Sequence, residues 1–473
     1  MTSQSIKAHD TAAVLGFGRS GRAAARFLAD QGLQVSVYES RLPQKEEIAP
    51  YLARGVRFFE GSFPPFFEES LLVRSPVIRP DIGPIVASLE RGATLSDEAS
   101  LFLSHTHARL IGVTGSDGKT TTSALIAEML KASGKRVFLG GNNGVPLLLR
   151  AGEMTPDDFA VLELSSFQLM TLEPALEVAV ITNLTPNHLD WHRDMAEYAA
   201  AKARLLKHAG RAVLRADLLQ ALGLDEKDLP PTTFFGESVA PPPLRASDAR
   251  IFRRGDALIL SGAGGESEFP CLAEFRLPGE HNIENLSAAL AAVYPLVSRQ
   301  AVLDTAHGFG GVPHRLQFVG RVAGVEFYNS SIDTSPTRTD AALKALGRTP
   351  LVIVGGKGKG ISLKPLGDSL ARYARAVFAY GETGEEIERA IDGRVPCERF
   401  ALFGEAFAGA SRAAKHGDTV LLSPGCTAFG EFKDFEERGE RFCQLVSALG
   451  KEKQLGIEGI DPRAGGADEH YGL

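Results

Sequence analysis

The chain has 473 residues, of which 44% are hydrophobic and 23% charged, a composition typical of a globular protein that is too long for a single core. Its formal net charge of −7 argues against a nucleic-acid partner and against binding to an anionic membrane surface. Four scattered cysteines, a polar first segment and the lack of a long apolar run favour a reduced, cytoplasmic protein without membrane insertion.

The first predicted unit is a strand, a glycine-rich turn, a helix and a second strand that ends at Glu39, within residues 12–40. The glycines of GFGRSG and an acid about twenty residues further on match the dinucleotide-binding fingerprint. Alone, this pattern favours an NAD-dependent oxidoreductase. The glycine turn and the helix N-terminus would, however, bind a pyrophosphate equally well whichever nucleoside follows it.

A second glycine loop, GVTGSDGKTTT, lies at residues 112–122 between a short strand and a long helix. Such a loop lets several backbone N–H groups point at one phosphate. Lys119 can bridge the β- and γ-phosphates of ATP, and the Thr120 hydroxyl can coordinate Mg²⁺. The predicted ATP-binding residues here are Gly115, Ser116, Asp117, Gly118, Lys119, Thr120 and Thr121.

Further apolar strands are predicted in chain order at 159–166, 178–184, 349–360, 375–381 and 418–425, with short β-like pieces near 263–265 and an amphipathic helix at 281–297. The strand ending at Glu163 would place a carboxylate beside the phosphate loop, where it could bind Mg²⁺. Strands that alternate with helices predict an α/β fold with three domains and mostly parallel sheets. The expected boundaries are 1–104, 105–312 and 313–454, with a mobile tail at 455–473.

Seven motifs in order resemble the Mur ligases, the ATP-dependent amide-forming enzymes of peptidoglycan synthesis. They are GVTGSDGKTTT, LGGNNGVPLL, LELSSFQL, ITNLTPNHLDWH, LPGEHNIENLSAALAA, PHRLQFVG and LLSPGCTAFGEFKDFEERGERF. The resemblance covers almost the whole chain outside the tail. It implies a Rossmann-like N-terminal domain that binds the UDP-substrate, a P-loop ATPase-like central domain and a Rossmann-like C-terminal domain that binds the amino acid.

The resemblance also implies a reaction. The expected substrates are UDP-N-acetylmuramoyl-L-alanine (UDP-MurNAc-L-Ala), D-glutamate and ATP, joined through an acyl phosphate with release of ADP and phosphate by a monomeric enzyme. The opening glycine turn would then bind UDP rather than NAD. Three alternatives stay open: a related ligase with another amino acid, an NAD-dependent oxidoreductase, and a nucleotide-binding protein without catalysis.

Residue roles follow from the motifs that match. The implied catalytic residues are Lys119, His188 and Lys202, and Thr120, Glu163, His188 and Lys202 would hold Mg²⁺, as two ions. Lys202 would be carbamylated, although by composition alone it is a surface lysine on an Ala-rich helix. His192 and Asp190 are given lower weight than His188.

The remaining implied contacts fall into three groups. The UDP-substrate would contact Gly18, Arg19, Ser20, Glu39, Ser40, Arg41, Asn142, Ser165 and Gln168. ATP would also contact Asn282, Asn285 and Arg315, although a helix N-cap role is an alternative for Asn282. The amino acid would contact Thr334, Lys359, Thr427 and Phe435, with Lys357 as a neighbour that could be mistaken for Lys359.

Two positions depart from the family pattern. In NSSIDTSPT (329–337), Ser330 replaces an acid and Ile332 replaces a lysine, and Asp333 could compensate for the missing acid. Ala428 stands where a serine is expected to bind the amino-acid side chain, so Thr427 would have to reach that carboxylate. Amino-acid specificity could differ as a result.

Overall fold

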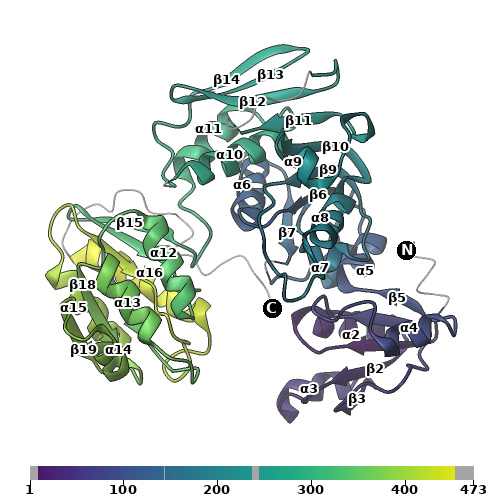
Figure 1. Cartoon of the computed structure of the whole chain (residues 1–473), viewed down its shortest axis with the longest axis horizontal. Helices are drawn as coiled ribbons and strands as arrows, with labels where there is room; N and C mark the ends of the chain where they lie inside the picture. The colour runs from purple at the N-terminus through teal and green to yellow at the C-terminus, as the bar shows by residue number, and fades with distance from the viewer. Residues whose placement is uncertain (1–8, 143, 237–243, 278, 453–473) are drawn as a thin grey trace. The chain divides into compact units, whose positions relative to one another are not determined.

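The computed structural model describes residues 9–142, 144–236, 244–277 and 279–452. Within this part of the chain, three sheets are each flanked by helices (Figure 1), which confirms the predicted α/β fold. The chain divides into two compact units. Of the described residues, the first unit holds those within 9–273 and 283–305 with the first two sheets, and the second holds those within 274–282 and 306–452 with the third. The predicted tail, 455–473, lies outside the described residues.

The first sheet has five parallel strands in the order β3-β2-β1-β4-β5. Its strands are β1 (Thr11–Leu15), β2 (Gln34–Glu39), β3 (Arg57–Glu60), β4 (Leu71–Arg74) and β5 (Thr94–Ser96), and its helices are α2 (Arg19–Asp30), α3 (Lys45–Leu52), α4 (Gly83–Leu89) and α5 (Glu98–His105). The predicted strand-turn-helix-strand unit is confirmed, with its second strand ending at Glu39.

The second sheet has nine strands in the order β14-β13-β12-β11-β10-β9-β6-β8-β7. The strands are β6 (Arg109–Thr114), β7 (Val137–Gly141), β8 (Phe159–Glu163), β9 (Ala175–Ile181), β10 (His208–Arg215), β11 (Thr232–Phe235), β12 (Ala249–Arg254), β13 (Ala257–Gly262) and β14 (Gly265–Phe269). From β7 to β12 the neighbours are parallel, whereas β12, β13 and β14 form antiparallel hairpins. These hairpins are the short β-like pieces expected near residues 263–265.

The helices that follow the second sheet's strands include α6 (Lys119–Ala132), α7 (Ser166–Leu169), α8 (Met195–Ala203), α9 (Leu218–Leu222), α10 (Glu280–Val293) and α11 (Arg299–Gly308). Short 3-10 helices lie at Leu148–Glu153, Arg204–Leu206 and Glu226–Asp228. Because consecutive residues from Asn285 to Val293 are all buried, α10 is covered on every side there, and the predicted amphipathic pattern is wrong. The helix also ends before Pro295, which cannot extend it.

The third sheet has six strands in the order β15-β16-β20-β17-β18-β19, with only β15 antiparallel to its neighbour. Its strands are β15 (Gln317–Val322), β16 (Val325–Asn329), β17 (Leu351–Gly355), β18 (Ala376–Tyr380), β19 (Cys397–Phe400) and β20 (Thr419–Leu422), and its helices are α12 (Pro336–Leu346), α13 (Lys364–Tyr373), α14 (Gly384–Ile391), α15 (Phe403–Ala413) and α16 (Phe435–Glu452).

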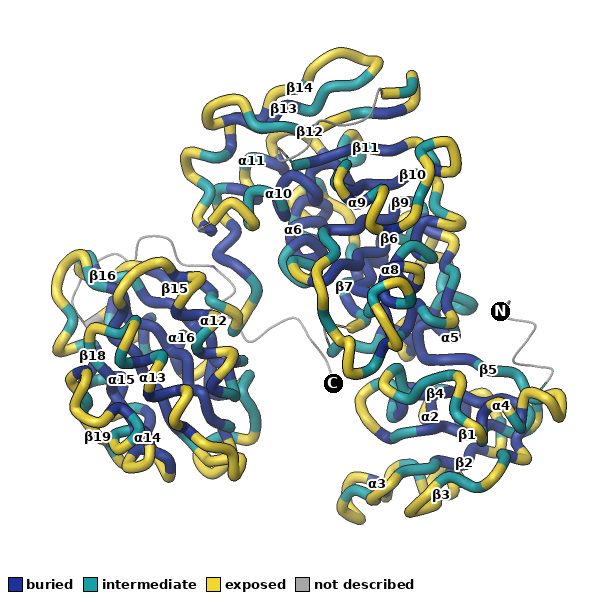
Figure 2. The backbone as a smooth tube through the Cα atoms, in the orientation of Figure 1, coloured by how far each residue is buried: buried dark blue, intermediate teal, exposed yellow. Residues whose placement is uncertain are grey.

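Apolar side chains fill the space between each sheet and its helices. The strands β8, β17 and β20 are buried along their whole length, as parallel strands covered on both faces must be. Figure 2 shows the buried residues in the interior of the molecule, with exposed residues mainly in the connecting loops. The loops at the carboxyl ends of the strands remain partly exposed, and the phosphate loop and the first glycine turn lie there. Among the described helices, none is long and apolar enough to cross a membrane.

Candidate functional site

The phosphate loop joins β6 to α6 and has the backbone shape that its glycines predict. Gly118 has a φ of +77°, and Gly115 has a φ of +152°. A Cβ atom on Gly115 would lie 1.9 Å from Thr182 Oγ1, and one on Gly118 would lie 2.3 Å from Asn285 Oδ1. Both positions therefore require glycine. In this structure the Lys119 ammonium donates to the carbonyl oxygens of Gly115 (3.0 Å) and Ser116 (2.9 Å).

Residues after β9 brace this loop from outside. Asn183 accepts a hydrogen bond from the Asp117 backbone N–H (2.8 Å), and Thr182 donates to the Asp117 carbonyl (2.6 Å). The Ser116 hydroxyl donates to the Thr185 carbonyl and lies 2.9 Å from the Tyr198 hydroxyl. The loop is thus fixed by its neighbours while its own glycine amides line the turn. Thr182, Asn183 and Tyr198, which hold the loop, were not identified in the sequence analysis, because no local pattern pairs them with a loop more than 60 residues away.

Glu163 ends the parallel strand β8 beside the phosphate loop and is buried. Its Oε1 atom accepts a hydrogen bond from Asn142 Nδ2 (2.9 Å), so the structure brings these two predicted residues together. Its Oε2 atom is buried and has no hydrogen-bond partner among the described residues. A buried carboxylate oxygen without a partner is costly, and a cation is the usual way to satisfy it.

Lys202 lies on α8 and is only 1% exposed, so the interpretation as a surface lysine is wrong. Because α8 is rich in alanine, its polar and apolar faces are hard to tell apart, and the composition of the helix does not reveal that Lys202 is buried. The Lys202 amine donates to the Gly115 carbonyl (2.8 Å) and lies 4.5 Å from the centre of the Tyr198 ring. Burial lowers the pKa of Lys202 well below its ordinary value, and the nearby Lys119 lowers it further.

His188 follows β9 in a turn with a positive φ of +54°. Its carbonyl accepts the backbone N–H groups of Trp191 (3.1 Å) and His192 (2.9 Å), and its ring packs against Phe167 at 4.9 Å between ring centres. Burial lowers the pKa of His188, and Lys119 and Lys202 add to this, so the neutral imidazole is favoured. A neutral imidazole is the form that binds metal ions.

The other histidine of this motif has a different environment. The His192 side chain is fully buried, with Nδ1 3.2 Å from Glu197 Oε2 and Nε2 2.9 Å from Ser166 Oγ. Both ring nitrogens are therefore used in packing this region, which fits the lower weight given to His192 as a ligand.

The conventional metal ligands here are few. Among the described residues, no group of three or more His, Cys, Asp and Glu side chains could hold a metal ion by itself. Mg²⁺ in phosphate-transferring sites is commonly held by one or two carboxylates together with substrate phosphates and water. The unpartnered buried oxygen of Glu163 fits such a shared site.

In the first sheet, the glycine turn after β1 has its predicted shape. Gly16 has a φ of +87°, and Gly18 precedes α2 without a side-chain cap, which leaves that helix end open for an anion. Glu39 accepts backbone N–H groups of the turn itself and of its own loop, from Phe17 (2.7 Å), Ser40 (2.8 Å) and Arg41. Burial raises the pKa of Glu39, but these hydrogen bonds outweigh it, and the pKa is lowered.

Three predicted UDP-substrate residues at the starts of α2 and α7 make contacts that link the first two sheets or cap a helix. Arg19 Nη1 donates to the Gly144 carbonyl (3.2 Å), next to the loop of Asn142, and Ser20 lies in the same first turn of α2. Ser165 and Gln168 form a reciprocal cap at the start of α7, with Ser165 Oγ and Gln168 Oε1 2.9 Å apart.

In the second unit, two predicted amino-acid contacts meet. The Lys359 ammonium donates to the Thr334 hydroxyl (3.2 Å), and both residues follow strands of the third sheet. The Thr427 hydroxyl donates to the Lys357 carbonyl (2.9 Å), so its proton is committed to the backbone in this structure. Ala428 is buried.

Other predicted residues of the second unit lie close by. Phe435 begins α16 and its carbonyl accepts a hydrogen bond from the Ser331 hydroxyl (2.8 Å), whereas Arg315 is exposed. Asp333 is buried, accepts a hydrogen bond from the Ser423 hydroxyl (2.8 Å), and has a pKa that burial raises to about 6. Asn282 lies inside α10, which begins at Glu280, so the N-cap alternative for Asn282 is wrong.

One functional candidate of this unit was missed in the sequence. Arg438 is completely buried and donates to the Ser331 and Cys426 carbonyls at 2.9 and 3.2 Å. It stands three residues after Phe435 and four before Phe442, on the apolar face of α16. That helical spacing is a signal that could have identified a buried arginine.

The chain is similar to known protein families and to known proteins. A family model described as the Mur ligase middle domain matches residues 113–293, and one described as the Mur ligase, glutamate ligase domain, matches residues 314–426. A Symbiobacterium thermophilum protein named UDP-N-acetylmuramoylalanine--D-glutamate ligase is 38% identical over 460 residues, or 94% of this chain and 99% of that protein. Its namesake from Acetivibrio thermocellus is 35% identical and covers 92% and 96%.

A solved structure gives the same fold. The UDP-N-acetylmuramate-alanine ligase MurC of Thermotoga maritima matches with a TM-score of 0.52 at 18% identity, covering 93% of this chain and all of that one. At this identity the match supports the fold alone.

Proposed function

The chain belongs to the Mur ligase family, and from this premise we propose that it joins D-glutamate to UDP-MurNAc-L-Ala at the expense of ATP, in peptidoglycan precursor synthesis. The proposal takes its substrates from the near full-length likeness to proteins named for that activity. The observation that carries it is the meeting of the phosphate loop, Glu163 and buried Lys202 at one edge of the second sheet.

The chemistry explains why these groups are needed. A carboxylate is a poor electrophile, so ATP first transfers its γ-phosphoryl group to the substrate carboxylate, and ADP leaves. The amine of D-glutamate then attacks the acyl carbon, the bond to phosphate breaks, and the nitrogen loses a proton to give the amide. Both steps depend mainly on positioning and on neutralising negative charge.

The phosphate loop supplies the first set of positive groups. Lys119 now donates to two loop carbonyls, and an incoming triphosphate would draw its ammonium toward the β- and γ-phosphates. Gly115, Ser116, Asp117, Gly118, Thr120 and Thr121 complete the predicted cradle. Asn285, which contacts Gly118, and Asn282 are proposed to lie toward the adenine, and Arg315 is proposed to contact the γ-phosphate.

Mg²⁺ would be held by Thr120, Glu163, His188 and the modified Lys202, in two ions. When bound, it would offset the charge of the transferring phosphoryl group. We assign Glu163 to this set because its unpartnered buried oxygen fits a cation.

Lys202 is proposed to carry a carbamate. Its lowered pKa favours the neutral amine, whose nitrogen can attack carbon dioxide and release one proton, which leaves a carboxylate on the side chain. Protein labelled with ¹³C-bicarbonate should show a carbamate carbon signal that is absent from Lys202→Ala. A spectrum without this signal would remove Lys202 from the metal ligands.

The UDP-substrate is proposed to bind across the first two sheets. Gly18, Arg19 and Ser20 would face the diphosphate, and Glu39, Ser40 and Arg41 the uridine. Asn142, Ser165 and Gln168 would contact the sugar-peptide part. The predicted domain boundaries, 1–104, 105–312 and 313–454, assign these roles to separate domains. A cytoplasmic monomer is proposed, which light scattering can test.

For the amino acid, we propose that Lys359 and Thr334 bind a carboxylate, with Thr427 and Phe435 framing the site. Thr334 accepts the Lys359 hydrogen bond, so its own hydroxyl proton can still be donated. Because the Thr427 proton is committed to a backbone carbonyl and Ala428 has no hydroxyl, another amino acid is a second candidate substrate.

One assay separates these possibilities. Phosphate release should depend on UDP-MurNAc-L-Ala and be fastest with D-glutamate in a panel that includes L-lysine, meso-diaminopimelate and L-alanine. Lys119→Ala should lower kcat by about 10³-fold, since it removes charge stabilisation from the phosphoryl transfer. Preference for another amino acid would favour the second candidate, and indifference to Lys119→Ala together with NADH binding would favour an oxidoreductase. Nucleotide binding without phosphate release would indicate a non-catalytic protein.

A further inference from the structure

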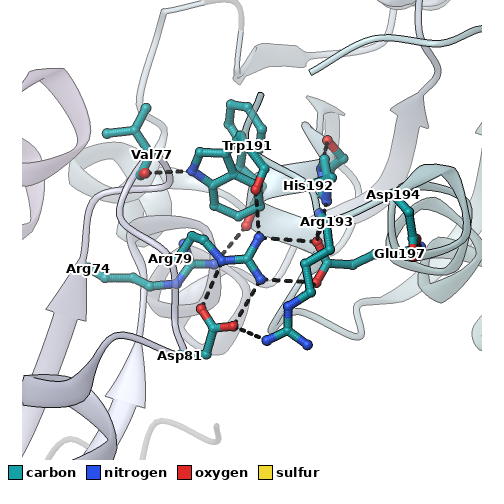
Figure 3. A network of polar contacts seen from close by, with 11 residues as sticks. Arg74, Val77, Arg79, Asp81, Trp191, His192, Arg193, Asp194 and Glu197 are labelled. Atoms are coloured by element: carbon teal, nitrogen blue, oxygen red, sulfur yellow. Dashed lines mark hydrogen bonds and ion pairs between the residues drawn. The ribbon is translucent and has the colours of Figure 1, made fainter. Parts of the chain in front are cut away.

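Residues 75–81 form a short segment after β4, between the glycine turn that follows β1 and the turn that carries His188. At its start, the Ser75 backbone N–H donates to the Leu15 carbonyl (2.8 Å), and a Cβ on Gly16 would lie 3.0 Å from Ser75 Cβ. At its centre, the Val77 carbonyl accepts the Trp191 indole N–H (2.7 Å), as Figure 3 shows. The segment therefore contacts both the first glycine turn and the turn that carries His188.

Arg79 makes the most extensive contact of this segment. All five of its N–H groups have acceptors: Asp81 Oδ1 and Oδ2 (2.8 and 2.9 Å), Glu197 Oε1 and Oε2 (3.0 and 3.1 Å) and the Trp191 carbonyl (2.6 Å). Its guanidinium also lies 4.9 Å from the centre of the Trp191 ring. Figure 3 shows the guanidinium between Trp191, Asp81 and Glu197. We call Arg79, Asp81, Trp191, Arg193 and Glu197 the Arg79 network.

From Glu197 the contacts continue into the site. Glu197 Oε2 lies 3.2 Å from His192 Nδ1, and the His192 ring packs against Tyr198 at 5.2 Å between ring centres. The Tyr198 hydroxyl is 2.9 Å from Ser116 Oγ in the phosphate loop, and the Tyr198 ring lies under the Lys202 amine. An unbroken series of contacts thus joins Arg79 to the phosphate loop and to Lys202.

The same network holds the turn of His188. Trp191 and His192 both donate their backbone N–H groups to the His188 carbonyl, so fixing Trp191 also fixes His188. Phe167 packs against the rings of His188 and Trp191. A second arginine of the region, Arg74, donates to the Phe167 carbonyl (2.7 Å) and so holds the opposite side of this aromatic cluster.

We propose that Arg79 is a positioning residue for the ligation: it aligns the His188 turn and α8, which carries Lys202, with the nucleotide-binding turn of the first sheet. Arg79 touches neither predicted ligand group, so it acts through Trp191 and Glu197. Because a displacement of about 1 Å in a catalytic centre can cost about 100-fold in rate, loss of the network should lower kcat. The rate effect depends on the proposed function, whereas the alignment can be observed without it.

The chain provides a reporter and a matched control. Trp191 is the only tryptophan, so intrinsic fluorescence reports the Arg79 network directly. Arg109 pairs with both oxygens of Glu177 and lies 4.4 Å from the centre of the Phe159 ring, which reproduces the carboxylate pair and ring contact of Arg79 away from the His188 turn. Arg79→Met and Arg109→Met therefore each remove a bidentate carboxylate pair and a ring contact, at two places in one unit.

The experiment compares wild type, Arg79→Met, Arg79→Lys and Arg109→Met. We expect Arg79→Met to shift Trp191 emission to longer wavelength, to increase acrylamide quenching, and to lower kcat about 30-fold with the KM for D-glutamate changed less than about twofold. Arg79→Lys should regain only part of kcat, because a lysine cannot form the bidentate, stacked contact. Arg109→Met should match wild type in emission and kcat.

Three results would overturn the proposal: an unchanged Trp191 spectrum in Arg79→Met, an unchanged kcat in an active enzyme, or an equal loss of kcat in Arg109→Met. If wild type does not ligate D-glutamate, the proposed function fails. The emission contrast between Arg79→Met and Arg109→Met then decides the alignment by itself.

Discussion

Arg79 in the first unit and Arg438 in the second both donate several hydrogen bonds near strand ends, but to different kinds of acceptor. Arg79 binds two carboxylates and one carbonyl and remains 20% exposed. Arg438 is fully buried and donates to the Ser331 hydroxyl and carbonyl, the Cys426 carbonyl and the Tyr380 hydroxyl. Among the described residues, no carboxylate forms an ion pair with Arg438.

The carboxyl groups of the two regions also differ, in the direction in which their pKa values are shifted. Hydrogen bonds from Arg79 lower the pKa of Glu197 to about 2, whereas burial raises the pKa of Asp333 to about 6 despite its hydroxyl partners. The first region pairs opposite charges near the surface. The second stabilises single charges through hydroxyl groups and through carbonyl groups of the loops that follow β16 and β20. The comparison indicates that removing the buried Arg438 guanidinium should cost more stability than removing an exposed, paired charge in the first unit.

The largest expected effect is that of Arg438→Met. It leaves two buried carbonyls and two hydroxyls without their donor, and each unmet buried acceptor costs about 1–3 kcal/mol. We expect the free energy of unfolding to fall by about 4 kcal/mol, as measured by urea denaturation followed by circular dichroism.

Arg441→Met on the same helix is the control, since Arg441 is exposed, and it should leave stability unchanged. Arg438→Lys keeps the charge but not the planar fork, and it should lose about half as much stability. A stable Arg438→Met variant would contradict the distinction between the two regions.

A second prediction concerns Asp333 and pH. Because its folded pKa is about 6 and its ordinary value 3.8, the unfolded chain releases this proton at lower pH than the folded chain. The stability contributed by this group is therefore greatest below about pH 4 and is lost as pH rises to about 6, a loss of about 3 kcal/mol. Asp333→Asn should be more stable than wild type at pH 8 by up to this amount and should match it at pH 4.

The urea concentration at the midpoint of unfolding, measured from pH 4 to pH 8, tests the direction of this pH dependence. Asp340→Asn is the control on α12, because Lys344 holds the Asp340 carboxylate and lowers its pKa, and stability there is lost as pH falls. Parallel pH profiles for wild type and Asp333→Asn would show that Asp333 has no raised pKa.

The smallest effect is expected in the first unit, at Arg193. Its side chain is 69% exposed and pairs with Asp81 and Glu197, and exposed ion pairs are worth at most about 1 kcal/mol. Arg193→Met should change the unfolding free energy by about 0.5 kcal/mol or less, leave Trp191 emission unchanged and lose its effect in high salt. A red-shifted emission would mean that Arg193, rather than Arg79, holds the tryptophan.

Much of this molecule could be predicted from the sequence because its signals are local. The glycines of 112–122 and the apolar strands ending at Glu163 and Ile181 can each be recognised from a short stretch of sequence, and the parallel sheet brings their ends together. The family resemblance then supplied residues such as Lys202 and Lys359. The roles of these residues in binding remain predictions.

The Arg79 network, the burial of Lys202 and the partners of Arg438 could not be predicted, because they depend on contacts between residues that are far apart in the sequence. Arg79 meets Trp191 and Glu197 across more than 110 residues, and no spacing rule connects them. Lys202 looks exposed in an alanine-rich helix because the covering side chains, including Tyr198, gain their position only from the folded sheet. The partners of Arg438 likewise come from two different loops and from strand β18.

The braces of the phosphate loop have a thermodynamic consequence. Since Thr182, Asn183 and Tyr198 already hold Ser116 and Asp117, the loop loses its conformational freedom during folding and not when a nucleotide arrives. Calorimetric titration with an ATP analogue should accordingly show only a small loss of conformational entropy from the ordering of this loop. Thr182→Val, which removes no nucleotide contact, should weaken binding through the entropy while leaving the binding enthalpy nearly the same.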